Sequence, residues 1–241
     1  MAIAWPSAYR DPVTGQNNGT ITDRIDRARE AARESDRTLT AMRHGSIPGA
    51  GGRVRPLSLF GDPVLHTPCA QVTDFGPALA RLVEDMYATM YAAQGVGLAA
   101  NQVGQGLRVF VYDCPDDEER RHLGHVVNPR LVAADGEVLR GPEGCLSLPG
   151  FEAGTPRFDH AVVEGVTVVG EPVRIHGTGF FARCLQHEVD HLGGSVYTER
   201  VTGWRRRRAL RAAERFSQGR APRDPAASSA LRAPAGTFPV P

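Results

Sequence analysis

The apolar residues in the central part of the chain follow helical periodicity in two places. Between residues 77 and 93, apolar side chains recur every three or four positions, which predicts an amphipathic helix that packs against a sheet. A second apolar run of helical length covers residues 180–192 and holds several polar residues. Its apolar flanks predict a largely buried helix, so its histidines would be buried as well and would need polar partners.

Shorter segments rich in β-branched and aromatic residues lie between the two predicted helices and predict strands. The clearest is 107–112, and the charged residues 113–123 that follow it are expected to form a loop. Two separate strand pieces are expected around Pro129. Segments 162–169 and 172–175 are joined by a turn-prone Gly-Glu pair, which predicts a hairpin.

The two ends of the chain differ from this central part in composition. Residues 1–53 are predicted to be an N-terminal extension, with a weak surface helix at 21–43 followed by a glycine-rich linker. A basic helix is expected at 204–216, and a disordered tail rich in Pro, Ala and Ser at 217–241. The folded domain is therefore expected to cover 54–203.

Composition limits the class of protein. Of the 241 residues, 41% are hydrophobic and 23% charged, which is ordinary for a globular protein, and the net charge of +1 gives no general attraction to nucleic acid or anionic membranes. No stretch reaches the roughly 20 apolar residues of a membrane span, and residues 1–16 lack the pattern of a signal peptide. Four widely spaced cysteines without such a signal argue against a disulfide framework. The expected location is the cytoplasm.

The second predicted helix carries the clearest chemistry, in the sequence Q-H-E-V-D-H at 186–191. His187 and His191 lie one helical turn apart on one face, so both imidazoles can reach a single ion. In this H-E-x-x-H arrangement Glu188 would serve as a base toward a metal-bound water. Two histidines leave a tetrahedral site incomplete, and the candidates for the third ligand are Cys145 and several acidic residues. The alternative, a structural helix with two exposed histidines, disagrees with the apolar flanks.

Two further motifs precede the histidine motif: G-V-G-L-A-A-N-Q at 95–102 and E-G-C-L-S at 143–147. In this order and at these separations, the three resemble the signature motifs of bacterial peptide deformylase, and the likeness extends over residues 54–216. The high content of arginine and alanine is similar to that of actinobacterial proteins. The resemblance implies an α+β fold, in which antiparallel or mixed β-sheets pack around a central buried helix that carries the H-E-V-D-H sequence.

The resemblance also implies an activity, that of a metal-dependent hydrolase with its catalytic domain at 54–203. Such an enzyme removes the N-formyl group from the formyl-methionine of nascent polypeptides and releases formate, a step of N-terminal methionine processing in protein biosynthesis. Cys145, His187 and His191 would bind one divalent metal, with Fe²⁺ expected in the cell and Ni²⁺, Co²⁺ or Zn²⁺ able to replace it. A metal-bound water would attack the formyl carbon, with Glu188 as acid and base.

The same resemblance assigns the remaining site residues. Gln102 and the backbone N–H of Leu146 would polarise the formyl oxygen. The substrate contacts are expected from five positions: Val96, Gly97, Gly144, Phe180 and Cys184. The first three would pair with the peptide backbone as an added strand, while the last two, together with Val96 and the ring of His187, would line the methionine pocket.

Two departures from the family pattern concern the substrate rather than the chemistry. Glu152 stands where many bacterial members carry an arginine that helps to fix the peptide, which puts the outer substrate contacts in question. Arg183 stands on the metal-binding helix where an apolar pocket residue is common. We expect its guanidinium to extend outward to solvent, with its stem alone lining the pocket.

Two other interpretations stay open at this point. A general H-E-x-x-H metallopeptidase would cut internal peptide bonds, but its usual third ligand is a downstream Glu or His, and little acidic sequence follows His191 except Glu199. A ribosome-binding module with secondary chemistry is suggested by a run of arginines, because a basic terminal helix resembles the segment by which some deformylases dock near the ribosomal exit tunnel. These residues are Arg205, Arg206, Arg207, Arg208 and Arg211. A solvated charged helix end would show the same run. No membrane or specific DNA partner is expected.

Overall fold

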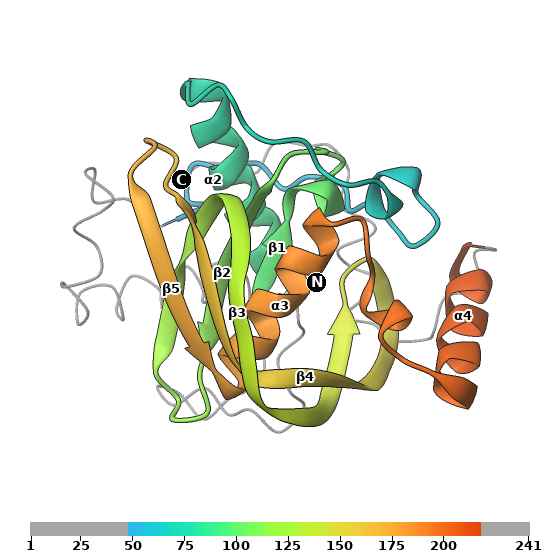
Figure 1. The fold of residues 1–241 in the computed structure, drawn as a ribbon. Helices are drawn as coiled ribbons and strands as arrows, with labels where there is room; N and C mark the ends of the chain where they lie inside the picture. Colours follow the sequence, from blue (N-terminus) through green and yellow to red (C-terminus); the bar gives the residue numbers. More distant parts are fainter. Residues whose placement is uncertain (1–47, 218–241) are drawn as a thin grey trace.

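The computed structural model describes residues 48–217 (Figure 1). The weak helix predicted at 21–43 and the tail from residue 218 onward lie outside the described residues, and the predicted domain boundaries at 54 and 203 stay predictions. The described elements, with 3-10 helices labelled η, are η2 Pro63–His66, α2 Pro77–Ala92, β1 Gly97–Ala99, η3 Ala100–Val103, β2 Val109–Pro115, β3 Arg121–Cys145, β4 Leu148–Val166, β5 Pro172–Thr178, α3 Gly179–Leu192, η4 Tyr197–Glu199 and α4 Gly203–Ser217. None of these helices is long and apolar enough to cross a membrane.

The five strands form one antiparallel sheet in the order of the chain, β1-β2-β3-β4-β5. Alternate side chains of β2 point to opposite faces of this sheet, as the pleat of a strand requires. Val109 and Val111 pack in the cluster that includes α2, whereas Phe110 and Tyr112 pack in the cluster that includes α3. The sheet therefore lies between two helices (Figure 1), and the expected α+β fold around a central buried helix is confirmed.

The predicted helix at 77–93 is confirmed as α2, which is one residue shorter. Pro77 occupies its first turn, where the missing N–H costs no hydrogen bond. The side chains of Met86 and Met90 are fully buried against the sheet, so the apolar periodicity reports core packing.

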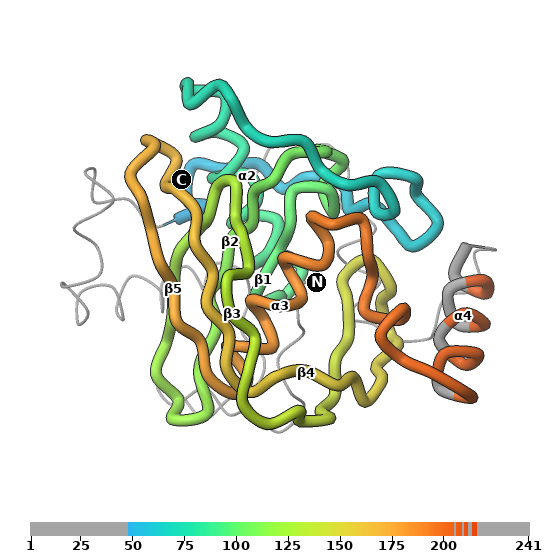
Figure 2. The backbone as a smooth tube through the Cα atoms, viewed as in Figure 1, coloured from blue at the N-terminus to red at the C-terminus, as the bar shows by residue number. Residues whose placement is uncertain are grey.

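Strands β3 and β4 make a long hairpin that bends beneath α3 (Figure 2). The prediction of two strand pieces around Pro129 is wrong, because β3 runs continuously from Arg121 to Cys145. The pairing with β4 shifts register between Val127 and Arg130, and a bulge of this kind accommodates the missing N–H of Pro129. The hairpin predicted within 162–175 is confirmed by the pairing of β4 with β5.

The loop predicted at 113–123 is shorter than expected, because β2 and β3 pair as far as Pro115 and Arg121. The carboxylate of Asp116 accepts hydrogen bonds from the backbone N–H groups of residues 118 and 120, both at 2.9 Å, which closes a tight turn. Asp113 is held by the guanidinium of Arg121 at 2.6 Å. The charged residues are thus satisfied within the hairpin, a pairing that composition alone does not reveal.

Helix α3 confirms the buried helix predicted at 180–192, and it begins one residue earlier, at Gly179. The carboxylate of Asp117 accepts a hydrogen bond from the N–H of Phe180 at 2.9 Å and so satisfies the first turn. Gly179 has a φ of +52°, and a Cβ there would lie 1.9 Å from this carboxylate, so only glycine fits. Phe181 and Leu185 are buried in the core and anchor the helix beside the sheet.

Candidate metal centre

Three potential ligands for one metal ion meet between the end of β3 and the middle of α3. Cys145 ends β3, while His187 and His191 lie one turn apart on α3. One ligand atom of each residue lies within 4.8 Å of the others, and the Sγ of Cys145 is 3.4 Å from the Nε2 of His191. All three side chains are buried. The structure therefore brings together the three residues that the sequence assigned to the metal, although 42 or more positions separate the cysteine from the histidines in the chain.

The donor set suits a divalent transition metal. Burial holds the pKa of His187 and of His191 well below the ordinary range, so both imidazoles are neutral and can offer a lone pair. Among the described residues, the Nε2 of His187 has no hydrogen-bond partner, and leaving a buried polar atom without one is costly. Burial raises the pKa of the Cys145 thiol, which a bound cation would reverse. Two imidazoles and a thiolate fit zinc or ferrous iron. All four cysteines are buried free thiols, as expected.

Glu188 lies on α3 between the two histidines and is fully buried. Gly97 of β1 faces it directly, because a Cβ at this position would lie 2.5 Å from the Oε1 of Glu188 and 2.9 Å from the Sγ of Cys184. Only a residue without a side chain leaves room for the carboxyl group there. Burial raises the pKa of Glu188 to about 8, so its proton can be exchanged near neutral pH.

The side-chain amide of Gln102 is fixed on the other side of the cysteine. Its Oε1 accepts a hydrogen bond from the N–H of Ala99 at 3.0 Å, which directs its Nε2 to the Oγ of Ser147 at 3.2 Å and the Sγ of Cys145 at 3.6 Å. Leu146 follows Cys145 in the tight turn between β3 and β4. Both predicted oxyanion donors therefore lie beside the cysteine ligand.

The five predicted substrate positions lie at the start of β1, near the end of β3 and on α3. Val96 and Cys184 are in contact, since the Sγ of Cys184 lies 3.8 Å from the carbonyl oxygen of Val96, and both are fully buried. Phe180 is half-buried in the first turn of α3. Gly97 belongs to β1, which lies at one edge of the sheet, and Gly144 directly precedes Cys145 at the end of β3.

Two residues that the sequence did not single out join the metal centre from β3 and β4. The carboxylate of Glu143 lies 2.5 Å from the Nδ1 of His187 and accepts hydrogen bonds from Arg157 at 2.6 and 3.0 Å. Arg157 also donates to Asp190 at 2.6 Å. A carboxylate on the second nitrogen of a histidine ligand orients the ring and sets its tautomer. The signal in the sequence was an acidic residue two positions before Cys145.

The prediction for Arg183 is wrong. Its side chain does not extend to solvent but is buried, with 7% of the residue exposed, and it donates to Glu143 at 2.9 Å. A carboxylate partner makes burial of a guanidinium tolerable. Glu152, the other residue that departs from the family pattern, is exposed on β4 and pairs with Gly144 of β3.

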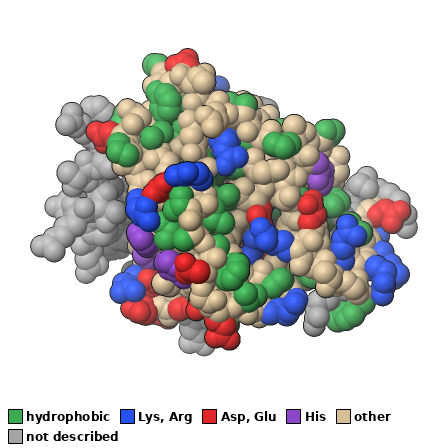
Figure 3. Space-filling model, viewed as in Figure 1, with side chains coloured by type: hydrophobic (Ala, Val, Ile, Leu, Met, Phe, Trp, Pro, Cys, Tyr) green, Lys and Arg blue, Asp and Glu red, His purple; other side chains and the backbone are tan. Residues whose placement is uncertain are grey.

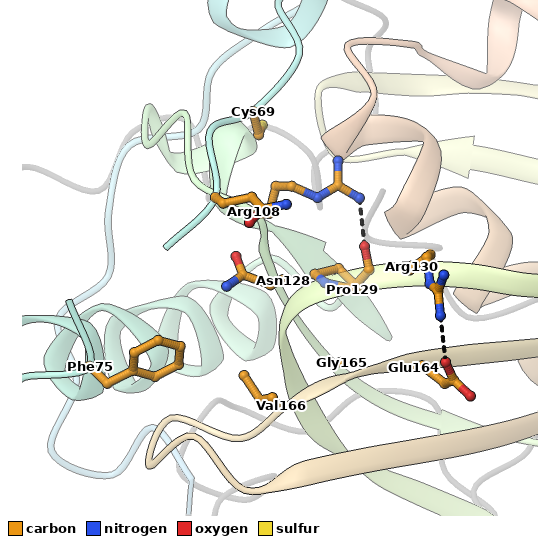
Figure 4. Close-up of a pocket in the computed structure, with 10 residues that line it drawn as sticks. Cys69, Phe75, Arg108, Asn128, Pro129, Arg130, Glu164, Gly165 and Val166 are labelled. Carbon is orange, nitrogen blue, oxygen red and sulfur yellow. Dashed lines mark hydrogen bonds and ion pairs between the residues drawn. The ribbon is translucent and has the colours of Figure 1, made fainter. Parts of the chain in front are cut away.

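A separate hollow of about 770 Å³ lies on the surface away from these residues (Figure 4). Several of its polar side chains are engaged in the fold: Arg108 donates to the carbonyl oxygens of Leu192 and Pro129, at 3.2 and 2.6 Å, and Arg130 pairs with Glu164 at 2.9 Å. No residue of the metal centre lines this hollow. It is a distinct feature of the surface rather than the entrance to the centre.

The chain is similar to known proteins over the part that carries all three motifs. A family profile described as polypeptide deformylase matches residues 54–207. Peptide deformylase 2 of Streptomyces avermitilis is 74% identical over 183 residues, which cover 75% of this chain and 98% of that protein. The crystal structure of peptide deformylase from Thermus thermophilus aligns with a TM-score of 0.62 at 38% identity, covering 69% of this chain and 99% of that one. The structure of the Ehrlichia chaffeensis enzyme in complex with actinonin aligns with a TM-score of 0.64 at 32% identity, covering 69% and 98%.

Proposed function

The chain belongs to the polypeptide deformylase family, and from this premise we propose which of its residues carry the reaction. The protein is a hydrolase that removes the N-formyl group from the N-terminal formyl-methionine of nascent polypeptides and releases formate. The interpretation as a general metallopeptidase is thereby set aside.

We propose that Cys145, His187 and His191 hold one divalent cation and that this cation is Fe²⁺ in the cell. The observation that carries the proposal is the convergence of three buried donors, one of which, the Nε2 of His187, has no partner within the described residues. A cation bound there supplies Lewis acidity toward water and toward the formyl oxygen. Ni²⁺, Co²⁺ and Zn²⁺ suit the same donors. A thiolate beside ferrous iron would make the enzyme sensitive to oxygen.

Glu188 is proposed as the general acid and base. Its carboxyl group is held against Gly97 in a space from which solvent is excluded, and burial brings its pKa to about 8. In its ionised form such a group can take a proton from the attacking water, and it can then return that proton to the departing amine. The glycine and the raised pKa support this role together.

Gln102 and the backbone N–H of Leu146 are proposed to stabilise the negative charge that develops on the formyl oxygen. The Gln102 amide is held in place beside the site, because its oxygen accepts from the N–H of Ala99 and its nitrogen faces Cys145. Preorganised donors of this kind each contribute about 100- to 1,000-fold to the rate.

The peptide is proposed to lie along the free edge of β1, where it would pair with Val96 and Gly97 and with Gly144 across the site. An outermost strand can accept an extended peptide as an added strand. The methionine side chain would enter the space lined by Phe180 and Cys184. This arrangement would place the formyl group beside Glu188.

Metal content and substrate choice test these roles together. Protein purified without oxygen is expected to contain iron by elemental analysis and to hydrolyse formyl-Met-Ala-Ser. Cys145→Ala is expected to lose the metal. The control Cys114→Ala removes a different buried thiol and should keep the metal. Full metal content in the Cys145 variant would refute the ligand assignment. Cleavage of an unformylated internal peptide in place of the formylated one would contradict the substrate.

We also propose that α4 contacts the ribosome. This helix stands at the edge of the molecule beside β4 and η4, and basic side chains gather there (Figure 3). Arg206, Arg207, Arg208 and Arg211 are exposed on it. Arginines grouped on one exposed helix favour binding to RNA phosphates.

Sedimentation with ribosomes at rising salt concentration tests this contact, because phosphate contacts weaken steeply with salt. Replacing Arg206, Arg207, Arg208 and Arg211 by alanine is expected to reduce co-sedimentation and its dependence on salt. The control replaces Arg130 and Arg174, exposed on the sheet, and should behave as the wild type. Unchanged association after deletion of residues 204–241 would refute the contact, while deformylation of a free peptide should not change.

A further inference from the structure

The carboxylate of Glu143 is enclosed by hydrogen-bond donors on all sides. Its Oε1 faces the Nδ1 of His187 at 2.5 Å and accepts from the Nη2 of Arg157 at 2.6 Å. Its Oε2 accepts from the Nε of Arg157 at 3.0 Å and from the Nη1 of Arg183 at 2.9 Å. Four donors match the acceptor capacity of a carboxylate, so its orientation is fixed. Through Oε1 this orientation determines how the ring of His187 is turned.

Arg183 makes two more contacts that tie α3 to the strands below it. Its Nη1 donates to the carbonyl oxygen of Thr155 on β4 at 2.8 Å, and its Nη2 donates to that of Leu139 on β3 at 3.0 Å. One guanidinium therefore connects the helix that carries both histidines with the strand that ends in Cys145. A planar group with several donors suits such a three-way connection, and a lysine does not.

Gly141 on β3 provides the space for this guanidinium. A Cβ at this position would lie 2.9 Å from the Nη2 of Arg183 and 3.2 Å from its Cζ. The φ of Gly141 is not in the left-handed region, so the backbone there accepts any residue. The three atoms nearest to this Cβ all belong to Arg183, so the two residues form a matched pair.

We propose that Arg183 is a positioning residue of the metal centre: it holds Glu143 and the β3 end against α3, and thereby keeps His187 turned toward Cys145 and His191. The inference rests on the metal centre proposed above. Arg183 itself contacts neither metal nor substrate in this role.

Loss of Co²⁺ from the full-length protein to excess chelator, followed by visible absorption, tests the proposal without measuring activity. We expect Arg183→Leu to release Co²⁺ about tenfold faster than wild type, the lower end of what loss of a ligand's supporting partner causes. The rate of Co²⁺ release from Arg183→Lys should lie between those of wild type and Arg183→Leu. The control Arg121→Leu removes a different arginine–carboxylate pair, with Asp113 in the β2–β3 hairpin, and should release Co²⁺ as wild type does.

Gly141→Ala provides a second test that keeps the arginine. The added methyl group should displace the guanidinium and speed Co²⁺ release in the wild-type background, yet change nothing further in Arg183→Leu. Additive effects of the two substitutions, or equal release from wild type and Arg183→Leu, would overturn the role of Arg183 and leave the metal centre intact. A wild-type protein that takes up no Co²⁺ would overturn the metal centre, and this proposal with it.

Discussion

Both sides of the sheet are covered by a helix and buried, but the side chains on the two sides differ in chemical type. On the α2 side, side chains such as Met86 and Val111 form an apolar interior. On the α3 side, an equally buried layer contains the charged residues Glu143, Arg157 and Glu188. Burying such groups costs free energy unless they are paired, so a fold keeps them where their chemistry is used. The α2 side thus stabilises the protein, whereas the α3 side holds the residues that we propose for the reaction.

The largest effect is expected from Glu188 on the α3 side, the residue proposed as acid and base. Glu188→Gln keeps the size of the side chain but removes the proton exchange, so kcat for a formylated peptide should fall by about 10²- to 10⁴-fold. Metal content, measured by elemental analysis, should stay at the wild-type level. A fully active Glu188→Gln protein would refute the assigned base.

A substitution that leaves a cavity on the α2 side should lower stability without changing catalysis. Met86→Ala removes a fully buried side chain and should lower the free energy of unfolding by about 2–5 kcal/mol. The kcat per folded molecule and the metal content should not change, because Met86 belongs to the core cluster on the α2 side and Cys145 to the cluster on the α3 side. Urea unfolding measures the free energy of unfolding, a peptide assay at low temperature measures kcat, and elemental analysis measures the metal content. Metal loss without loss of stability would break the comparison.

A smaller effect is expected when the support of a ligand is weakened. Glu143→Gln replaces the carboxylate that contacts His187 and Arg157 with an amide, so metal affinity should fall by about 10- to 100-fold. Asp113→Asn is the matched control, since Asp113 also binds an arginine and is buried, but lies in the β2–β3 hairpin. It should reduce stability and leave metal affinity unchanged. Equal metal affinities of the two variants would contradict the role of Glu143.

Local sequence patterns predicted the helices, because the periodicity of a helix and the spacing of its residues can be read within a single segment. The helices at 77–93 and 180–192 follow from apolar positions, and the joint placement of His187 and His191 follows from a spacing of one turn. Cys145 was reached through the resemblance of its motif to a family, since nothing local shows which distant residue completes the ligand set.

The parts that the sequence did not predict depend on pairing across the fold. Arg183 was expected at the surface because its partners, Glu143 and the space above Gly141, lie about 40 positions upstream. The continuous β3 strand was missed because Pro129 interrupts the local strand signal, and the register shift that accommodates it is a property of two strands together. Charge in a sequence shows that a partner is needed, while the fold alone shows which partner it is.

The smallest expected effect concerns the pH dependence of stability in the metal-free protein. Burial raises the pKa of Glu188 to about 8, above its value in the unfolded chain, so the folded state binds the proton more tightly. The stability from this group is complete below about pH 4.5, the ordinary pKa of a glutamate, and is lost as the pH rises through about 8. Between about pH 7 and 8 the free energy of unfolding should therefore fall by about 1 kcal/mol.

This window isolates Glu188 from its neighbours. Burial lowers the pKa of His187 and His191, and above about pH 7 these rings are neutral in the folded state and mostly neutral in the unfolded state, so their contribution is small and of opposite sign. Urea unfolding of chelator-treated protein at the two pH values should show the decrease in wild type and no decrease in Glu188→Gln. Glu84→Gln on α2 is the control. Burial also raises the pKa of Glu84, but this residue is only half-buried, so the fall in the free energy of unfolding should persist in this variant. A decrease of the same size in Glu188→Gln would show that the buried charge of the α3 side does not set this pH dependence.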